Sequence, residues 1–249
     1  MNNELTIFLN FINMAVLASA PLLLATLGEI LTEKSGNLNL GVEGMMFMGA
    51  IAGLGAAYHY EQAVTLAGGT PSALIATGIA TLAAAGAGAL GALIYAFLVV
   101  TLRANQNVTG LTLTIFGTGF GNFFGELLGK QAGGFVQVSS ATKAMFSNIS
   151  FGSLSTIPVI GPLFFNYNWL VYFSVIVMFG MAWFLAKSRR GLNLRAVGEN
   201  PATADAAGIN VTLYKYTATI IGGALCGLGG MYISMSSTAC AGVWVHDCV

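Results

Sequence analysis

The side chains best suited to chemistry lie in two polar segments of an otherwise apolar sequence. The first segment, residues 28–44, contains Asn37 and Asn39, with Glu43 directly before an apolar run. Amide side chains both donate and accept hydrogen bonds, and a carboxylate is favoured at the N-terminus of a helix. These residue types predict hydrogen bonding to a polar molecule or to the backbone, and they do not indicate bond-making chemistry.

Two interpretations of this first segment remain open. Polar, non-helical backbone at membrane depth persists only where protein or a water-filled cavity surrounds it. Gly36 and Gly41 would allow the turns that a broken or re-entrant segment needs, and such a segment could line a transport pathway. The alternative is an ordinary cytoplasmic turn between two helices.

The second polar segment, residues 102–110, allows the same two interpretations. Asn105 and Asn107 cluster there directly after Arg103, which suggests the cytoplasmic boundary of a span. The segment could line or gate a pathway at a helix break. It could also be a short helix–helix connection that supplies an N-cap.

No set of residues for catalysis or for holding a metal ion stands out. The sequence lacks H-E-x-x-H, G-x-S-x-G and the phosphate-binding G-x-x-x-x-G-K-[ST]. Cys240, His246, Asp247 and Cys248 gather near the end, but their order matches no common zinc spacing. We therefore expect no enzymatic activity, no metal and no cofactor.

Composition predicts an all-α, polytopic membrane protein. Charged residues make up 7% of the chain, against about 25% in soluble globular proteins. Hydrophobic residues make up 56%, and the mean hydropathy is +0.78. Basic and acidic residues balance at 9 each, so nothing indicates a nucleic-acid partner.

Six stretches are long and apolar enough to be membrane helices of about 20 residues. We expect a single transmembrane domain over residues 1–249, whose first stretch is retained as a helix and not removed as a signal peptide. The uncharged third stretch is long enough to need strong tilt or a break. The expected spans are 8–30, 42–60, 72–102, 108–128, 169–186 and 213–235.

Basic residues predict the orientation of these spans, because cytoplasmic loops carry an excess of Lys and Arg. The loop 187–212 is placed in the cytoplasm, and the sides alternate outward from it. Segment 129–167 then becomes a long outer loop with room for a short surface helix. The cytoplasmic side holds Lys34, Arg103, Lys187, Arg189, Arg190, Arg195 and Lys215, and the outer side holds Lys130 and Lys143.

The cytoplasmic loop contains the signals of a short helix. Asn200 is a suitable N-cap, Pro201 suits the first helical position and Gly208 suits the position after the end. A helix this short is unstable alone in water. It therefore needs a partner surface, such as a soluble subunit, to hold it.

Three segments of the chain resemble one family. GLNLRAVGENPATADAAGI at 191–209 closely resembles the cytoplasmic coupling region of permease subunits in bacterial ABC importers for sugars, nucleosides and branched-chain amino acids. LGEILTEKSGNLNLGVEGMMFMG at 27–49 and LRANQNVTGLTLTIFGTG at 102–119 look like the nucleoside or simple-sugar branch of that family. The motifs occur in the family's order and spread over most of the chain.

The resemblance implies a type II-like ABC importer permease fold and a set of partners. Those partners are ATP-binding cassette ATPase subunits, a second permease subunit of the same or a similar kind, an extracytoplasmic substrate-binding protein and the lipid bilayer of a bacterial inner membrane. It places Gly198, Glu199, Asn200, Ala204 and Gly208 in the ATPase-docking loop. It places Asn37, Asn39, Glu43, Asn105 and Asn107 near the translocation pathway.

Other functions and an incomplete chain are also considered. The solute could be a branched-chain amino acid instead of a nucleoside or sugar. An ion-coupled secondary transporter would place ionisable groups within its spans, and Arg103 alone between residues 72 and 125 argues against that class. A membrane scaffold without transport would not need the two asparagine clusters. Family members usually continue with further spans, so C-terminal truncation is expected.

Overall fold

The six predicted spans all form helices in the computed structural model, which describes residues 3–134, 136–147, 149–150, 164 and 166–236. A two-residue antiparallel pair joins β1 (Ile149–Ser150) to β2 (Asn166–Tyr167). The long helices are α1 (Asn3–Lys34), α2 (Val42–Leu66), α3 (Ala73–Ala96), α4 (Gln106–Gln131), α7 (Trp169–Lys187) and α10 (Val211–Ser236). The shorter ones are α5 (Ser140–Met145), α8 (Arg189–Glu199) and α9 (Pro201–Ala206).

Four of the helical stretches in the described residues are long and apolar enough to cross a membrane by themselves. They are Ile7–Lys34, Ala73–Thr101, Trp169–Lys187 and Val211–Ser236. The other two predicted spans, α2 and α4, are less apolar. Helix α2 lies centrally and packs against α3, α4 and α10. An all-α polytopic fold with about six spans is therefore confirmed.

The third span is broken as well as long. Helix α3 continues into a π-helical turn, η1 (Phe97–Thr101), where Leu102 N donates to Phe97 O. Arg103 follows with a positive φ of 55°. The third stretch was expected to need strong tilt or a break because of its length. A break is present, and it lies at the end of the stretch, just before α4 begins.

Glycine packs α10 against its neighbours at backbone distance. A Cβ on Gly227 would lie 2.3 Å from Ala84 O of α3, and one on Gly223 would lie 2.3 Å from Ala92 Cβ. A Cβ on Gly230 would lie 1.9 Å from Met46 O of α2. Small residues such as these are the usual means of close helix approach in membranes.

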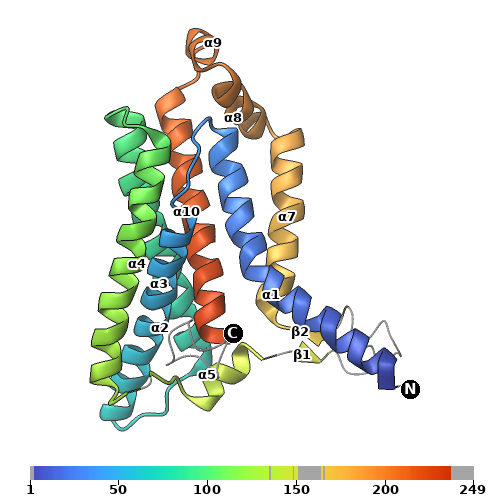
Figure 1. The fold of residues 1–249 in the computed structure, drawn as a ribbon, viewed down its shortest axis with the longest axis vertical. Helices are drawn as coiled ribbons and strands as arrows, with labels where there is room; N and C mark the ends of the chain where they lie inside the picture. The colour runs from blue at the N-terminus through green and yellow to red at the C-terminus, as the bar shows by residue number, and fades with distance from the viewer. Residues whose placement is uncertain (1–2, 135, 148, 151–163, 165, 237–249) are drawn as a thin grey trace.

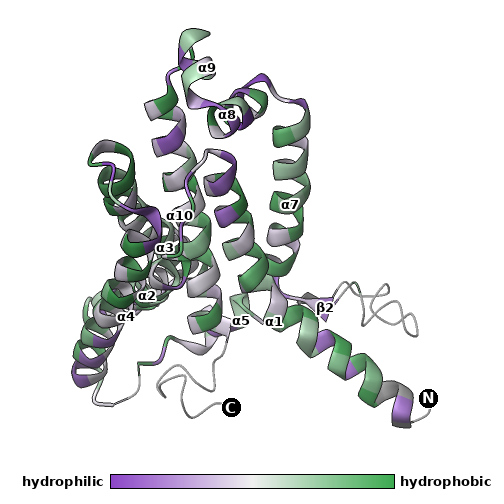
Figure 2. Ribbon diagram, turned by 45° about the horizontal axis from the view of Figure 1, so that its top comes forward, coloured by the Kyte–Doolittle hydropathy of each residue, from purple (hydrophilic) through white to green (hydrophobic). Residues whose placement is uncertain are grey.

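The two ends of the bundle differ in charge. Helices α8 and α9 lie at one end together with the C-terminus of α1 and the start of α10, whereas α5 lies at the opposite end (Figure 1). Hydrophilic residues gather around α8, α9 and the adjacent ends of α1 and α10 (Figure 2). The basic residues assigned to the cytoplasmic side fall in these elements or beside them, and Lys130 and Lys143 fall at the ends of α4 and α5. The helix arrangement agrees with the predicted alternation.

Candidate functional site

The chain between α1 and α2 is an extended segment buried in the bundle. We call residues 35–41 the α1–α2 segment. Asn37 and Asn39 are 1% and 3% exposed, whereas Leu38 and Leu40 between them are 39% and 43% exposed. This alternation places both asparagines on the inner face. The structure therefore supports a broken segment inside the protein and excludes an ordinary exposed turn.

Helix α1 ends in a glycine-dependent cap that redirects the chain inward. Gly36 has a φ of +85°, Gly36 N donates to Glu33 O at 2.8 Å, and Asn37 N donates to Thr32 O at 3.3 Å. These two bonds form the Schellman arrangement, which favours glycine at the left-handed position. Gly41 plays a different part from the one predicted, because its φ is −90°. Its missing Cβ makes room for Leu113 instead.

Side chains from α1 and α10 bind the inner face of the α1–α2 segment. Asn39 N donates to Glu29 Oε1 at 2.9 Å, and Asn37 Nδ2 donates to Thr219 Oγ1 at 3.3 Å. Asn39 Oδ1 accepts from Gly41 N at 2.9 Å. The predicted pathway residues Asn37 and Asn39 thus hold the segment in place from within.

Helices α3 and α4 bind the backbone of the same segment. Tyr95 Oη donates to Leu38 O. Gln106 Oε1 accepts from Leu38 N at 2.7 Å, and Thr114 Oγ1 donates to Leu40 O at 2.9 Å. Since backbone groups inside a membrane protein need partners, these side chains replace the hydrogen bonds that a continuous helix would have supplied.

Two acceptor oxygens at this site have no hydrogen-bond donor among the described residues. They are Asn37 Oδ1 and Glu29 Oε2, and both atoms are buried. A buried acceptor without a donor costs about 1–3 kcal/mol. The site can therefore accept hydrogen bonds from a polar molecule or an ordered water that reaches it.

The remaining predicted pathway residues lie at the edge of this site. Asn105 is exposed and caps α4, with its Oδ1 accepting from Asn107 N at 3.0 Å and Val108 N at 3.3 Å. Asn107 is exposed, and exposed Glu43 lies in the first turn of α2. The structure confirms the N-cap interpretation for Asn105. Sequence reasoning missed Gln106, whose side chain is the one that reaches the α1–α2 segment.

The loop 187–212 contains two consecutive helices. Asn200 ends α8 and caps α9, with its Oδ1 accepting from Thr203 N at 3.1 Å. Pro201 occupies the first turn of α9, and Gly208 follows it with a φ of +82°. These predicted caps are confirmed. Helix α8 was not predicted. Ser188 could have indicated its start, because serine is a common N-cap and its hydroxyl accepts from Gly191 N at 2.9 Å.

The residues expected to dock an ATPase differ in exposure. Glu199, Asn200 and Gly208 are exposed at the end of the bundle, and Ala204 is buried at 4%. Gly198 is half-buried and faces inward, with its Cα against Gly36 of the α1–α2 segment. The loop therefore presents polar residues outward while one glycine touches the buried site.

A carboxylate at the opposite end of the bundle holds the start of α5. Glu61 of α2 is 8% exposed, and its oxygens accept from Ser139 N at 2.7 Å, Ser139 Oγ at 2.8 Å and Thr142 Oγ1. These bonds tie the start of α5 to α2. No local pattern in the sequence predicts this contact. The short helix expected in the outer loop is α5, whereas PVIGP at 158–162 and the tail with Cys240 and His246 lie outside the described residues.

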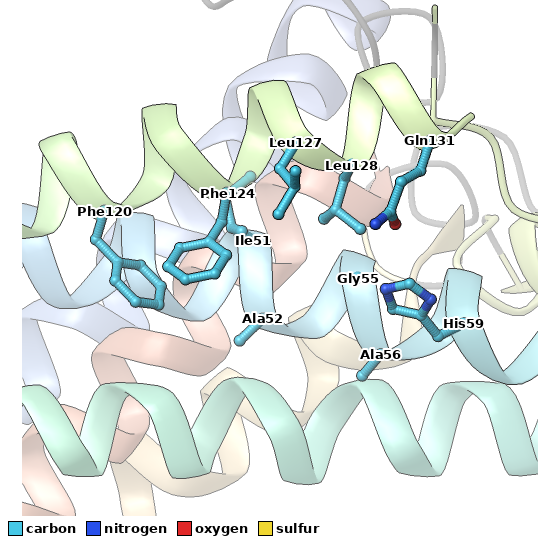
Figure 3. A pocket seen from close by; sticks show the side chains of 10 residues that line it. All are labelled: Ile51, Ala52, Gly55, Ala56, His59, Phe120, Phe124, Leu127, Leu128 and Gln131. Atoms are coloured by element: carbon cyan, nitrogen blue, oxygen red, sulfur yellow. The ribbon is translucent and has the colours of Figure 1, made fainter. Parts of the chain in front are cut away.

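A groove of about 290 Å³ lies between α2 and α4 (Figure 3). Its wall is apolar except at one end, where His59 and Gln131 come together. None of the predicted pathway residues lines it. The lining residues are Ile51, Ala52, Gly55, Ala56, His59, Phe120, Phe124, Leu127, Leu128 and Gln131.

Residues 10–243 match the sequence model of the family described as the permease component of the branched-chain amino acid transport system. The chain belongs to this permease family. It is thus a multi-pass membrane permease by family and by fold, and the family resemblance seen in the three motifs is confirmed.

Three curated relatives of this permease carry transporter names. It is 36% identical over 226 residues to the putative glucose ABC transporter permease protein TsgC13 of Haloferax volcanii. This alignment covers 90% of this chain and 62% of the relative. It is 34% identical to the nucleoside ABC transporter permease protein NupC of Lactococcus lactis, covering 85% and 63%. It is 33% identical to the guanosine ABC transporter permease protein NupQ of Bacillus subtilis, again covering 85% and 63%.

The permease chain thus spans about three-fifths of the length of these curated relatives, by shares of 62–63%. No solved structure matches it significantly.

Proposed function

We propose that this chain is the membrane-spanning permease subunit of an ATP-driven importer that moves a nucleoside or a sugar. The observation that carries the proposal is the family match over residues 10–243, with relatives named as glucose, nucleoside and guanosine ABC transporter permeases. The chain forms one transmembrane permease domain in a bacterial inner membrane, and ATP hydrolysis takes place on a separate subunit.

The polarity of the buried site supports a neutral, hydroxyl-bearing solute. The α1–α2 segment carries Asn37 and Asn39, and Asn37 Oδ1 and Glu29 Oε2 have no donor among the described residues. Hydroxyl groups of a sugar or ribose can donate to such acceptors. Asn37, Asn39, Glu43, Asn105 and Asn107 are the residues proposed to lie along or beside the pathway.

The exposed end of α8 and α9 supports an ATPase partner. Glu199, Asn200 and Gly208 are exposed there, and α9 is a capped helix of 6 residues that is too short to be stable alone. A cleft on an ATPase subunit would bury it. The full importer contains two permease subunits, two ATPase subunits and an extracytoplasmic binding protein that delivers the solute.

Reconstitution tests this function. The permease, its ATPase and its binding protein are placed in proteoliposomes, and uptake of labelled guanosine, glucose and leucine is measured with and without ATP. We expect ATP-dependent uptake of guanosine or glucose and none of leucine. Leucine uptake alone would indicate a branched-chain amino acid permease. Uptake that persists without ATP under a proton gradient would overturn the proposal in favour of an ion-coupled transporter.

Charge reversal on α8 tests the docking surface. Glu199→Arg should abolish co-purification of the ATPase, because the exposed carboxylate at the α8–α9 junction becomes a bulky cation. Glu126→Arg, at an exposed position on α4 near the opposite end of the bundle, is the matched control and should leave co-purification unchanged. Unchanged co-purification and uptake for Glu199→Arg would contradict the docking assignment.

A further inference from the structure

The cytoplasmic helices touch the buried α1–α2 segment through backbone alone. A Cβ on Gly198 of α8 would lie 2.4 Å from Lys34 O and 3.1 Å from Gly36 N. A Cβ on Gly36 would lie 3.2 Å from Gly198 Cα. No side chain fits between the two backbones, so a displacement of one is passed directly to the other.

On the cytoplasmic side, Gly198 belongs to a rigid arm. Helix α8 is anchored by buried Leu194, which packs in one cluster with Leu31 of α1 and Ala218 of α10. Asn200, two residues after Gly198, ends α8 and caps α9, so no flexible linker separates the two helices. Movement of α9 therefore moves the backbone at Gly198.

On the inner side, the contact meets the non-helical backbone of the α1–α2 segment. The α1–α2 segment is held by hydrogen bonds from four helices and not by a helix of its own. Gln106 bridges the residues next to the contact, because its Nε2 donates to Gly36 O at 3.4 Å and its Oε1 accepts from Leu38 N at 2.7 Å. Individual side-chain bonds of this kind can be exchanged without unfolding a helix.

Two buried acceptors, one on the segment and one on α1 beside it, are available for a second arrangement. Asn37 Oδ1 and Glu29 Oε2 are buried without a donor among the described residues. Unpaired buried acceptors favour an arrangement that supplies them with donors, which is the behaviour required of an element with two discrete states.

We propose that the contact between Gly198 and Gly36 is the joint that converts movement of α8 and α9 into rearrangement of the α1–α2 segment, and that Gln106 holds the segment in its present state. This proposal rests on the proposed function and deepens it, since it names the residues through which ATPase closure reaches the solute pathway. Gly198, Gly36 and Gln106 are positioning residues in this scheme and do not contact the solute.

The first test measures coupling, defined as solute molecules imported per ATP hydrolysed, in proteoliposomes that contain the permease, its ATPase and its binding protein. Gly198→Ala should lower coupling about tenfold, which is the usual scale of coupling between two sites. Gly180→Ala on α7 is the matched control, because a Cβ there meets nothing within 4 Å. It should keep wild-type coupling.

A second variant keeps the test decisive if Gly198→Ala does not fold. Gln106→Leu removes both bonds to the segment without altering α8, and it should also lower coupling while the ATPase still co-purifies. Wild-type coupling in Gln106→Leu, or in a folded Gly198→Ala, would overturn the proposal that the contact between Gly198 and Gly36 transmits movement. Failure of the unaltered permease to bind any ATPase would instead overturn the proposed function, so the two failures are distinguishable.

Discussion

The backbone N–H of Asn39, in the α1–α2 segment, donates to the carboxylate of Glu29 at 2.9 Å. Glu29 lies in α1, five residues before its last residue, and Asn39 lies in the chain that returns into the bundle. The bond therefore holds the α1–α2 segment against α1, inside the bundle.

The first prediction concerns Glu29. Glu29→Leu should destabilise the permease by about 1–3 kcal/mol, because it leaves the Asn39 N–H buried without an acceptor. Glu29→Gln should cost less, since its amide oxygen still accepts. Thermal unfolding in detergent measures both. Glu33→Leu, at an exposed position one turn later, is the control, and an equal loss in the Gln and Leu variants of Glu29 would contradict the role of this bond.

The second prediction concerns glycine packing. Gly230→Ala should destabilise the bundle by about 1–3 kcal/mol or more, because the added Cβ would lie 1.9 Å from Met46 O and force α10 away from α2. Gly86→Ala on α3 meets nothing within 4 Å and should raise stability by up to about 1 kcal/mol through helix propensity. Thermal unfolding in detergent compares the two. Similar melting temperatures would show that α10 tolerates separation from α2.

The third prediction concerns the end of the bundle where α5 packs against α2. Glu61→Ala removes the acceptor shared by Ser139 and Thr142, so α5 should detach from α2. A cysteine placed at Ala144, in a background without the native cysteines, should then react faster with a water-soluble maleimide. Glu126→Ala is the control, because its exposed pair with Lys130 contributes at most about 1 kcal/mol. Equal labelling rates in both variants would show that other contacts hold α5.

The fourth prediction concerns the end of α9. Gly208 has a φ of +82°, so Gly208→Val should strain the cap and weaken α9, whereas Gly208→Asn should be tolerated, since asparagine adopts this conformation more readily. Amide hydrogen exchange over residues 201–206 reports the helix itself, and ATPase co-purification tests the proposed docking. Faster exchange in the Val variant alone is the expected result. Equal exchange in the two variants would mean that the cap contributes little.

Local features of the fold were predictable because the signals lie next to one another in the chain. Asn200 and Gly208 bound α9 through capping rules that involve only a few neighbouring residues. The apolar runs similarly determine the six long helices, since a span needs only length and low polarity. Helix α8 was missed because its polar, glycine-containing sequence has weak helical preference, and packing of Leu194 against α1 and α10 stabilises it.

The buried site could be predicted only in part. The asparagines at 37 and 39 were recognised by their type, but the partner on α4 is Gln106 and not the neighbouring asparagines, because the direction of a side chain on a helix depends on how that helix packs. Glu61 was not recognised at all, since its partners Ser139 and Thr142 come from a distant loop. Their roles in transport stay predictions.

The sequence by itself determined that this is a helical membrane permease, which end of it is basic and where the short capped helix lies. Composition, span length and capping are local properties, so the chain carries them before it folds. Only the tertiary structure decided that the backbone of Gly198 meets that of Gly36, and that the segment beside Gly36 is held by four different helices. These contacts join residues far apart in the chain, and they exist only once the helices have packed.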